Sequence, residues 1–278
     1  MSEIQTQVRT RVIRPPSRLE FIDVGELLRY RDLLYFLVRR DIKVLYAQTV
    51  LGLSWAILNP TIQILIFTII FGNVAKISTD GVPYILFSTV AVIPWTYMSD
   101  AMNKASQSLV TNQNMLGKIY FPRIIFPLTP VIAKILDFMI SLVIVVGVMV
   151  YYDVEPTWNL LALPVFIVMM IILPFGIGLW LSALAIRFRD VKFAMTFALK
   201  LLIYTAPVLY PATAVPEQYQ FWYALNPLVS VIQGFRVCLL GDPWDLSLIL
   251  PGMVTGTILV LAGLIYFKRM ERVFVDVI

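Results

Sequence analysis

The sequence contains no histidine and a single cysteine, Cys238. Histidine-dependent acid–base catalysis and histidine-ligated zinc or haem are therefore excluded, as are an intrachain disulfide and a cysteine-rich metal site. Charged residues are also scarce, at 14% of 278 residues, whereas about 25% is usual in soluble domains. Because 59% of the residues are apolar, the composition indicates a polytopic membrane protein.

The sequence also lacks a Gly-x-x-x-x-Gly-Lys-Ser/Thr phosphate-binding loop. The nearest Gly-Lys pair, Gly117-Lys118, has Asn112 in place of the first glycine and Ile119 after the lysine. If ATP drives this protein, we expect ATP and magnesium to bind a separate ATPase subunit, and we expect no cofactor or metal on this chain. No long internal repeat supports an inverted-repeat carrier, and nothing indicates nucleic-acid binding.

Six apolar stretches predict an all-α integral membrane protein with six transmembrane helices. A cytoplasmic tail over 1–23 precedes them, and a cytoplasmic tail over 268–278 follows the membrane domain of residues 51–267. No cleavable signal peptide is evident, because about fifty residues, nine of them Lys or Arg, precede the first apolar span. The predicted spans cover residues 51–71, 83–101, 124–151, 159–186, 193–210 and 246–267.

Residues 24–48 are predicted to form an amphipathic helix at the membrane surface. Asp23 and Glu26 form a plausible cap at its start. One face carries Leu34, Val38, Ile42 and Leu45, and the other carries Arg39, Arg40 and Lys43; Asp41 interrupts the apolar face. This helix is either a lipid-surface anchor or a hinge through which a cytoplasmic partner pulls on the first span.

Basic residues determine the predicted orientation. Eighteen of the 22 Lys and Arg residues lie in the N-terminal segment, the 102–123 link, the 187–192 link and the C-terminal tail. The positive-inside rule therefore places these segments and both termini in the cytoplasm.

The stretch 211–245 is apolar and aromatic but divided by several Pro and Gly residues, so it predicts two short re-entrant helices. Asn226-Pro227 predicts a capped start for the second of these helices, which should end before Gly241. Glycine pairs at Gly176 and Gly178, and at Gly252 and Gly256, predict close helix packing.

Lys134, Asp137 and Lys200 are the candidate functional charges within the predicted spans. Lys134 and Asp137 lie three residues apart on one helical face and form either a structural ion pair or a gating or transport element. Lys200 either extends its long side chain to the membrane surface or couples an ion.

Polar and aromatic side chains also mark two faces. Trp55, Asn59, Gln63 and Phe67 follow each other at four-residue steps, as a helix-packing seam or as a channel wall. Aromatic residues from span five onward suit either an interfacial belt or contacts with sugar rings. They are Tyr204, Tyr210, Tyr219, Phe221, Trp222 and Tyr223.

Four motifs resemble ABC-2-type polysaccharide-export permeases, the membrane subunits of O-antigen, teichoic acid and capsule transporters. They are RDIKVLYAQTVLGLSWAILNP from Arg40, NMLGKIYFPR from Asn114, LDF from Leu136 and YALNP from Tyr223. The matches occur in order from about residue 30 to the last span.

The resemblance implies a homodimer of six-span permeases on two separate ATP-binding subunits, which exports a lipid-linked, O-antigen-like polysaccharide across the bacterial inner membrane. The 24–48 helix would be the interface helix, and the 102–123 link would contain the coupling helix. The coupling residues would be Asn114, Lys118, Ile119, Tyr120, Phe121, Arg123, Arg39 and Arg40. Spans one and five would line the channel, with the re-entrant helices at its outer end. The channel residues would be Trp55, Asn59, Gln63, Phe67, Tyr204, Tyr210, Tyr219 and Trp222.

Two alternatives remain open. An ABC-2-type permease for a drug or lipid would share this architecture, and neighbouring glycosyltransferase genes would favour the glycan. A secondary transporter or membrane enzyme would need an ion-coupling or catalytic constellation, for which only Lys134, Asp137 and Lys200 are candidates.

Overall fold

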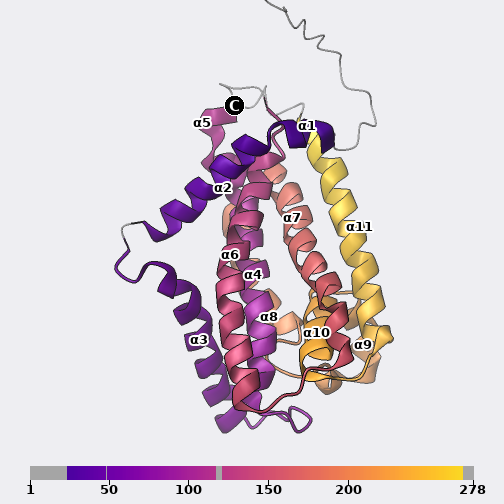
Figure 1. The fold of residues 1–278 in the computed structure, drawn as a ribbon. Helices are drawn as coiled ribbons and strands as arrows, with labels where there is room; N and C mark the ends of the chain where they lie inside the picture. The colour runs from indigo at the N-terminus through magenta and orange to yellow at the C-terminus, as the bar shows by residue number, and fades with distance from the viewer. Residues whose placement is uncertain (1–23, 48, 117–120, 272–278) are drawn as a thin grey trace, which may run out of the picture.

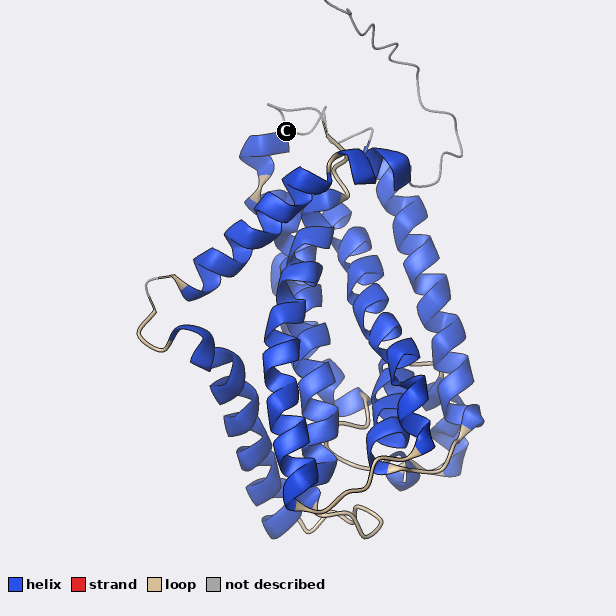
Figure 2. Ribbon diagram, viewed as in Figure 1, coloured by secondary structure: helices blue, strands red, loops and turns tan. Residues whose placement is uncertain are grey.

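The computed structural model describes residues 24–47, 49–116 and 121–271. All regular secondary structure in this part of the chain is helical (Figure 2). The long helices lie side by side in one bundle, and α2 crosses one end of it (Figure 1). The helices are α1 (Val24–Arg29), α2 (Arg31–Tyr46), α3 (Trp55–Phe67), α4 (Tyr84–Thr111), α5 (Gln113–Leu116), α6 (Ile125–Tyr151), α7 (Leu163–Arg187), α8 (Val191–Thr205), α9 (Glu217–Ala224), α10 (Pro227–Leu240) and α11 (Leu246–Glu271). Three short 3-10 helices, η1 (Gly52–Ser54), η3 (Trp158–Ala162) and η4 (Ala212–Ala214), and one π-helix, η2 (Thr68–Val74), complete them.

Helix α4 is the centre of the bundle. It packs most extensively against α6 and α7 and also contacts α3, α8 and α10. Most of its residues are buried, including small residues such as Ala91, Ala101 and Ala105 that let neighbouring helices approach. The main hydrophobic core therefore surrounds α4, and α3 and α8 lie at its margin.

Four segments are long and apolar enough to cross a membrane: Gly52–Val74, Ile125–Tyr151, Trp158–Arg187 and Leu246–Glu271. They correspond to predicted spans one, three, four and six. The predicted second span lies in α4, which is 28 residues long but less apolar than these four. The predicted fifth span is α8, whose 15 residues are fewer than the about 20 that a bilayer needs. A total of six spans is therefore not confirmed.

The amphipathic segment 24–48 forms two helices rather than one. The break lies at Tyr30, between α1 and α2, and α2 already ends at Tyr46. Both helices contribute to one apolar cluster with the ends of α6 and α11: Leu27 and Tyr30 pack around it and Leu37 is fully buried in it. The change of direction at Tyr30 lets both pieces follow the end of the bundle. The proposed cap residue Asp23 lies outside the described residues.

The helix of the second span extends further than we predicted from the polar and basic residues that follow it. We predicted an end at Ala101, but α4 extends to Thr111. The first ten residues of the predicted 102–123 link are therefore helix. Polar side chains there bond within α4, as Ser108 does to Ala105 O at 2.7 Å and Gln107 does to Asn103 Oδ1 at 2.9 Å.

The pair α9 and α10 bends by 98° at residues 225–226. The prediction for α10 is confirmed: Asn226 Oδ1 accepts the Leu228 N–H at 3.1 Å, Pro227 is the first helical residue, and Gly241 ends the helix with φ +75°. Asn226 Nδ2 also donates to Thr205 O at 3.1 Å, which ties this bend to the end of α8. The geometry fits either one broken span or a re-entrant pair.

Glycines allow several helices to touch. A Cβ at Gly176 of α7 would lie 2.6 Å from Val260 Cα of α11. A Cβ at Gly256 would lie 3.1 Å from Pro227 Cβ, at the start of α10. The predicted packing role of these glycines is confirmed.

Candidate functional site

A network of four side chains joins α2, α4 and α6, and we call it the charge network. Lys134 Nζ on α6 lies 2.6 Å from Asp100 Oδ2 on α4 and 2.8 Å from Asp137 Oδ2 one turn along its own helix. The Tyr46 hydroxyl, at the last residue of α2, donates to Asp137 Oδ1. The end of the amphipathic helix is thereby connected to the centre of the bundle.

The charge network is stable because each buried charge has a partner. Lys134 is only 8% exposed, and an isolated ammonium at that depth would cost several kcal/mol. Two carboxylates neutralise it, and the half-exposed Asp100 keeps contact with solvent. Burial, and the hydrogen bond to Asp137, raise the pKa of the Tyr46 hydroxyl above its ordinary value. Tyr46 therefore acts as a neutral donor at physiological pH.

A cavity of about 160 Å³ lies beside the charge network. Its walls come from the end of α2, the start of α3, and the facing sides of α4 and α6. Polar groups in its lining include Asn59, Thr96 and Asp100. The Thr96 hydroxyl is buried without a hydrogen-bond partner among the described residues. This half-open cavity combines space, charge and converging helix ends, which makes it the candidate functional site.

The start of α3 is bound to α6 through a carbonyl that proline leaves free. In a regular helix, Ala56 O would accept the N–H of residue 60, but Pro60 has none. The Ser141 hydroxyl of α6 lies 2.9 Å from Ala56 O and donates to it. The bond satisfies a buried carbonyl in the way that membrane helices require.

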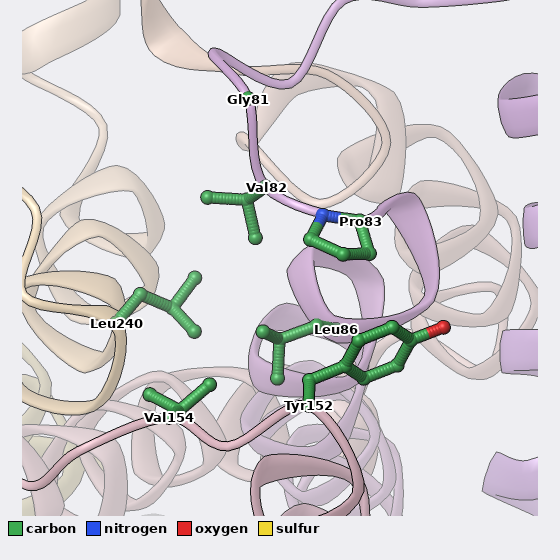
Figure 3. A pocket seen from close by; sticks show the side chains of 7 residues that line it. All are labelled: Gly81, Val82, Pro83, Leu86, Tyr152, Val154 and Leu240. Atoms are coloured by element: carbon green, nitrogen blue, oxygen red, sulfur yellow. The ribbon is translucent and has the colours of Figure 1, made fainter.

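A second cavity, of about 220 Å³, lies at the other end of the bundle. Val82, Leu86, Val154 and Leu240 project toward one another around it, while the Tyr152 hydroxyl points away (Figure 3). No charged side chain lines it, so it offers little chemistry.

The predicted coupling residues that the structure describes lie at the end of the bundle that α2 crosses. Arg40 Nη2 donates to Asn112 Oδ1 at 3.0 Å, joining α2 to the end of α4, and also pairs with Asp41 at 2.8 Å. Phe121 is buried in the apolar cluster under α1 and α2, and Arg123 donates to Glu271 O at 3.1 Å. Arg39 and Asn114 are exposed, and Lys118, Ile119 and Tyr120 lie outside the described residues.

The predicted channel residues form two separate groups in this chain. Trp55 and Asn59 line the cavity, and Phe67 packs against Phe71 with ring centroids 5.9 Å apart; Gln63 is half-buried. The second group lies on α8, α9 and the segment between them: Tyr204, Tyr219 and Trp222 are exposed, and Tyr210 donates to Tyr204 O at 2.8 Å. Helix α3 packs on α4 and α6, whereas α8 packs on α4 and α7, so the contacts within one chain do not bring the groups into one wall.

Of the three predicted intramembrane charges, Lys134 and Asp137 are brought together and Lys200 is not. Lys200 is exposed on α8 and has no ion pair among the described residues. Sequence reasoning missed Tyr46, Asp100 and Ser141, which are distant from the pair in sequence. The only available signal was that Asp100 stands in an otherwise uncharged stretch from 83 to 103.

Arg236 on α10 was also missed. Its guanidinium stacks on Phe87 of α4, with Cζ 3.6 Å from the ring centroid. The side chain is 1% exposed, and its Nε and Nη2 have no hydrogen-bond partner among the described residues. An arginine in an apolar half-length helix was the signal available in the sequence.

Membrane-length helices around a central α4, an amphipathic helix across one end and charges paired at helix junctions define a multi-pass membrane protein. The chain belongs to the ABC-2 type transporter family, whose pattern matches residues 32–240.

Curated relatives agree with this assignment. The chain is 27% identical over 248 residues to the O-antigen export system permease protein RfbA of Klebsiella pneumoniae, covering 89% of this chain and 95% of that protein. It is 28% identical to RfbA of Myxococcus xanthus over 77% of this chain and 82% of that protein. It is 26% identical to the polysialic acid transport protein KpsM of Escherichia coli over 70% of this chain and 76% of that protein.

Proposed function

We propose that this chain is the permease subunit of an ATP-driven exporter that moves a lipid-linked polysaccharide out across the bacterial inner membrane. The observation that carries the proposal is the match along 95% of an O-antigen export permease. A chain that aligns over nearly the whole of such a protein contains the same membrane domain. Two further relatives named for polysaccharide export or transport support the same cargo class.

The working unit in this proposal is a homodimer with two separate ATP-binding subunits, which hold ATP and magnesium. The six predicted spans are α3, α4, α6, α7, α8 and α11, with α9 and α10 re-entrant at the outer end and both termini cytoplasmic. Support comes from α2, α5 and the end of α11, which lie at one end of the bundle (Figure 1), as the basic residues require.

Motion of the ATPases would reach the membrane through two elements. The coupling link extends from Asn112 to Arg123, and α2 is the interface helix. Because Arg40 bonds Asn112, a displacement of the link would also move α2. The groups on α3 and on α8–α10 would face each other across the dimer, and their separation would open the channel.

The test is export by the purified permease–ATPase complex in proteoliposomes that contain the lipid-linked polysaccharide. Lys118→Ala with Tyr120→Ala should abolish export while ATP hydrolysis continues, because the link would no longer transmit motion. A matched double variant, Lys192→Ala with Tyr151→Ala, changes two exposed residues and should export normally. Full export by the first variant would contradict the coupling assignment. Transport of a drug or a free lipid with no polysaccharide transport would contradict the cargo.

A further inference from the structure

The link between α2 and α3 does not by itself fix the position of α3. Val50, Leu51 and Leu53 in this link are all exposed. Gly52 adopts a positive φ of +50°, and a Cβ built there would meet nothing within 4 Å. The joint between these helices therefore needs contacts from elsewhere in the bundle to hold it in place.

Two polar contacts from α6 reach the two sides of the joint. Asp137 accepts the Tyr46 hydroxyl at the end of α2, and Ser141 donates to Ala56 O at the start of α3. Asp137 and Ser141 are four residues apart and so lie on the same face of α6, one turn from each other. We call Tyr46, Asp137, Ser141 and the Ala56 carbonyl the α6 clip.

The clip can open because its α6 side has alternative partners. Ser141 Oγ lies 2.8 Å from Asp137 O of its own helix, so its hydroxyl remains bonded when α3 leaves. Asp137 likewise retains Lys134 at 2.8 Å. The Ala56 carbonyl lacks the donor four residues along that a regular helix would provide, because residue 60 is proline. Opening therefore exposes one carbonyl and one hydroxyl, which water in the adjoining cavity can satisfy.

The remainder of α3 offers little resistance to movement. In the apolar window of Gly52–Val74, 17% of the residues are buried, compared with 33% in Ile125–Tyr151 of α6. Ala56 and Ile64 are the hydrophobic residues of α3 that reach full burial. Polar contacts at the start of the helix consequently have a large share in holding it.

We propose that Tyr46 and Ser141 are positioning residues that hold the α2–α3 joint on α6, and that this clip opens when α2 moves during transport. The clip itself follows from the contacts above. Its opening by ATP rests on the proposed function, in which the ATPase subunits displace α2. When it opens, α3 separates from α6 and exposes the face that carries Ala56.

The experiment measures the modification rate of a cysteine placed at Ala56, which is 8% exposed and whose carbonyl accepts the Ser141 hydroxyl of α6. The full chain with Ala56→Cys, assembled with its ATP-binding subunits in membranes, is treated with a charged maleimide. Tyr46→Phe and Ser141→Ala should each raise the labelling rate without ATP by about three- to tenfold, the effect of losing one hydrogen bond. In the parent, ATP should raise labelling to a similar rate.

Matched controls separate clip opening from general loosening. Tyr151→Phe removes an exposed hydroxyl at the far end of α6, and Ser182→Ala removes a buried hydroxyl that bonds only Leu179 O of its own helix among the described residues. Both should label at the parent rate. The native Cys238 is 1% exposed and should stay unlabelled in every variant, whereas a partly unfolded protein would label there.

Labelling of both clip variants at the control rate would overturn the clip. If one variant fails to fold, the other decides the result. If the clip variants label rapidly but ATP leaves the parent unchanged, the opening step is wrong. Polysaccharide export, measured separately, reports on the proposed function, so the two failures are distinguishable.

Discussion

The contact between α7 and α11 at Gly176 gives the sharpest prediction of stability. Gly176→Ala would place a Cβ 2.6 Å from Val260 Cα, 2.8 Å from Val260 Cγ2 and 2.9 Å from Val260 Cβ. Ordinary carbon–carbon contacts are about 3.5–4.0 Å, so the helices would have to separate by about 1 Å. A side-chain rotation cannot relieve the overlap, because the nearest atom belongs to the backbone.

The expected magnitude follows from two opposing effects. Overpacking costs about 1–3 kcal/mol, and a contact with backbone belongs at the upper end of that range. Replacing glycine by alanine inside a helix stabilises the helix by about 1 kcal/mol. The net destabilisation is about 2 kcal/mol, which corresponds to a fall in melting temperature of about 4–8 °C for a protein of this size.

Cys238 provides the assay. It is the only cysteine of the chain and is 1% exposed, so a thiol-reactive fluorescent dye reports unfolding in detergent. The control is Gly147→Ala on α6, where an added Cβ would meet nothing within 4 Å and the melting temperature should stay level or rise. If Gly176→Ala melts at the same temperature as Gly147→Ala, the close approach of α7 and α11 is wrong.

The same dye assay tests three further predictions. Lys134→Met leaves two carboxylates without their shared cation and should lower the free energy of unfolding by about 3–5 kcal/mol. The control Lys200→Met changes an exposed lysine and should alter the free energy of unfolding by no more than about 0.5 kcal/mol. Equal effects of the two substitutions would contradict the charge network. Asn226→Ala should cost about 1 kcal/mol by removing the cap of α10, in addition to the loss of the Nδ2 bond to Thr205 O. Asn226→Ser, which keeps a capping oxygen but not the amide donor, should recover the capping share alone; a serine variant as unstable as the alanine variant would refute the cap. Arg236→Met removes two buried donor atoms without partners, each costing about 1–3 kcal/mol, against a cation–π contact of about 2 kcal/mol. Its melting temperature should therefore equal or exceed that of the parent, and a fall of several degrees would show that the buried guanidinium stabilises the fold.

Local signals explain which parts of the fold could be predicted. The start and end of α10 follow from Asn226, Pro227 and Gly241, whose effects act within one turn of helix. The proximity of Lys134 and Asp137 follows from helical spacing alone. Long apolar runs likewise predict four of the membrane-length segments to within a few residues.

The charge network could not be predicted, because it depends on how separate helices pack. Asp100 is 34 residues from Lys134, and Tyr46 is 91 residues from Asp137. The end of α4 was misplaced for the same reason: charges after Ala101 indicate an aqueous link, but in the folded chain polar groups there bond one another. The carbonyl–serine contact at Ala56 also requires knowing that α6 passes beside Pro60.

The pairing of Asp100 with Lys134 has a consequence for how the chain enters the membrane. Synthesis proceeds from the N-terminus, so α4 leaves the ribosome carrying Asp100 before Lys134 has been made. An aspartate near the middle of a nascent helix costs about 2.5–3.5 kcal/mol to insert. The one cation on α4 itself is Lys104, four residues after Asp100, and α4 is less apolar than α3, α6, α7 and α11. We therefore expect α4 to insert most stably together with α6, as a hairpin in which Lys134 pairs with Asp100.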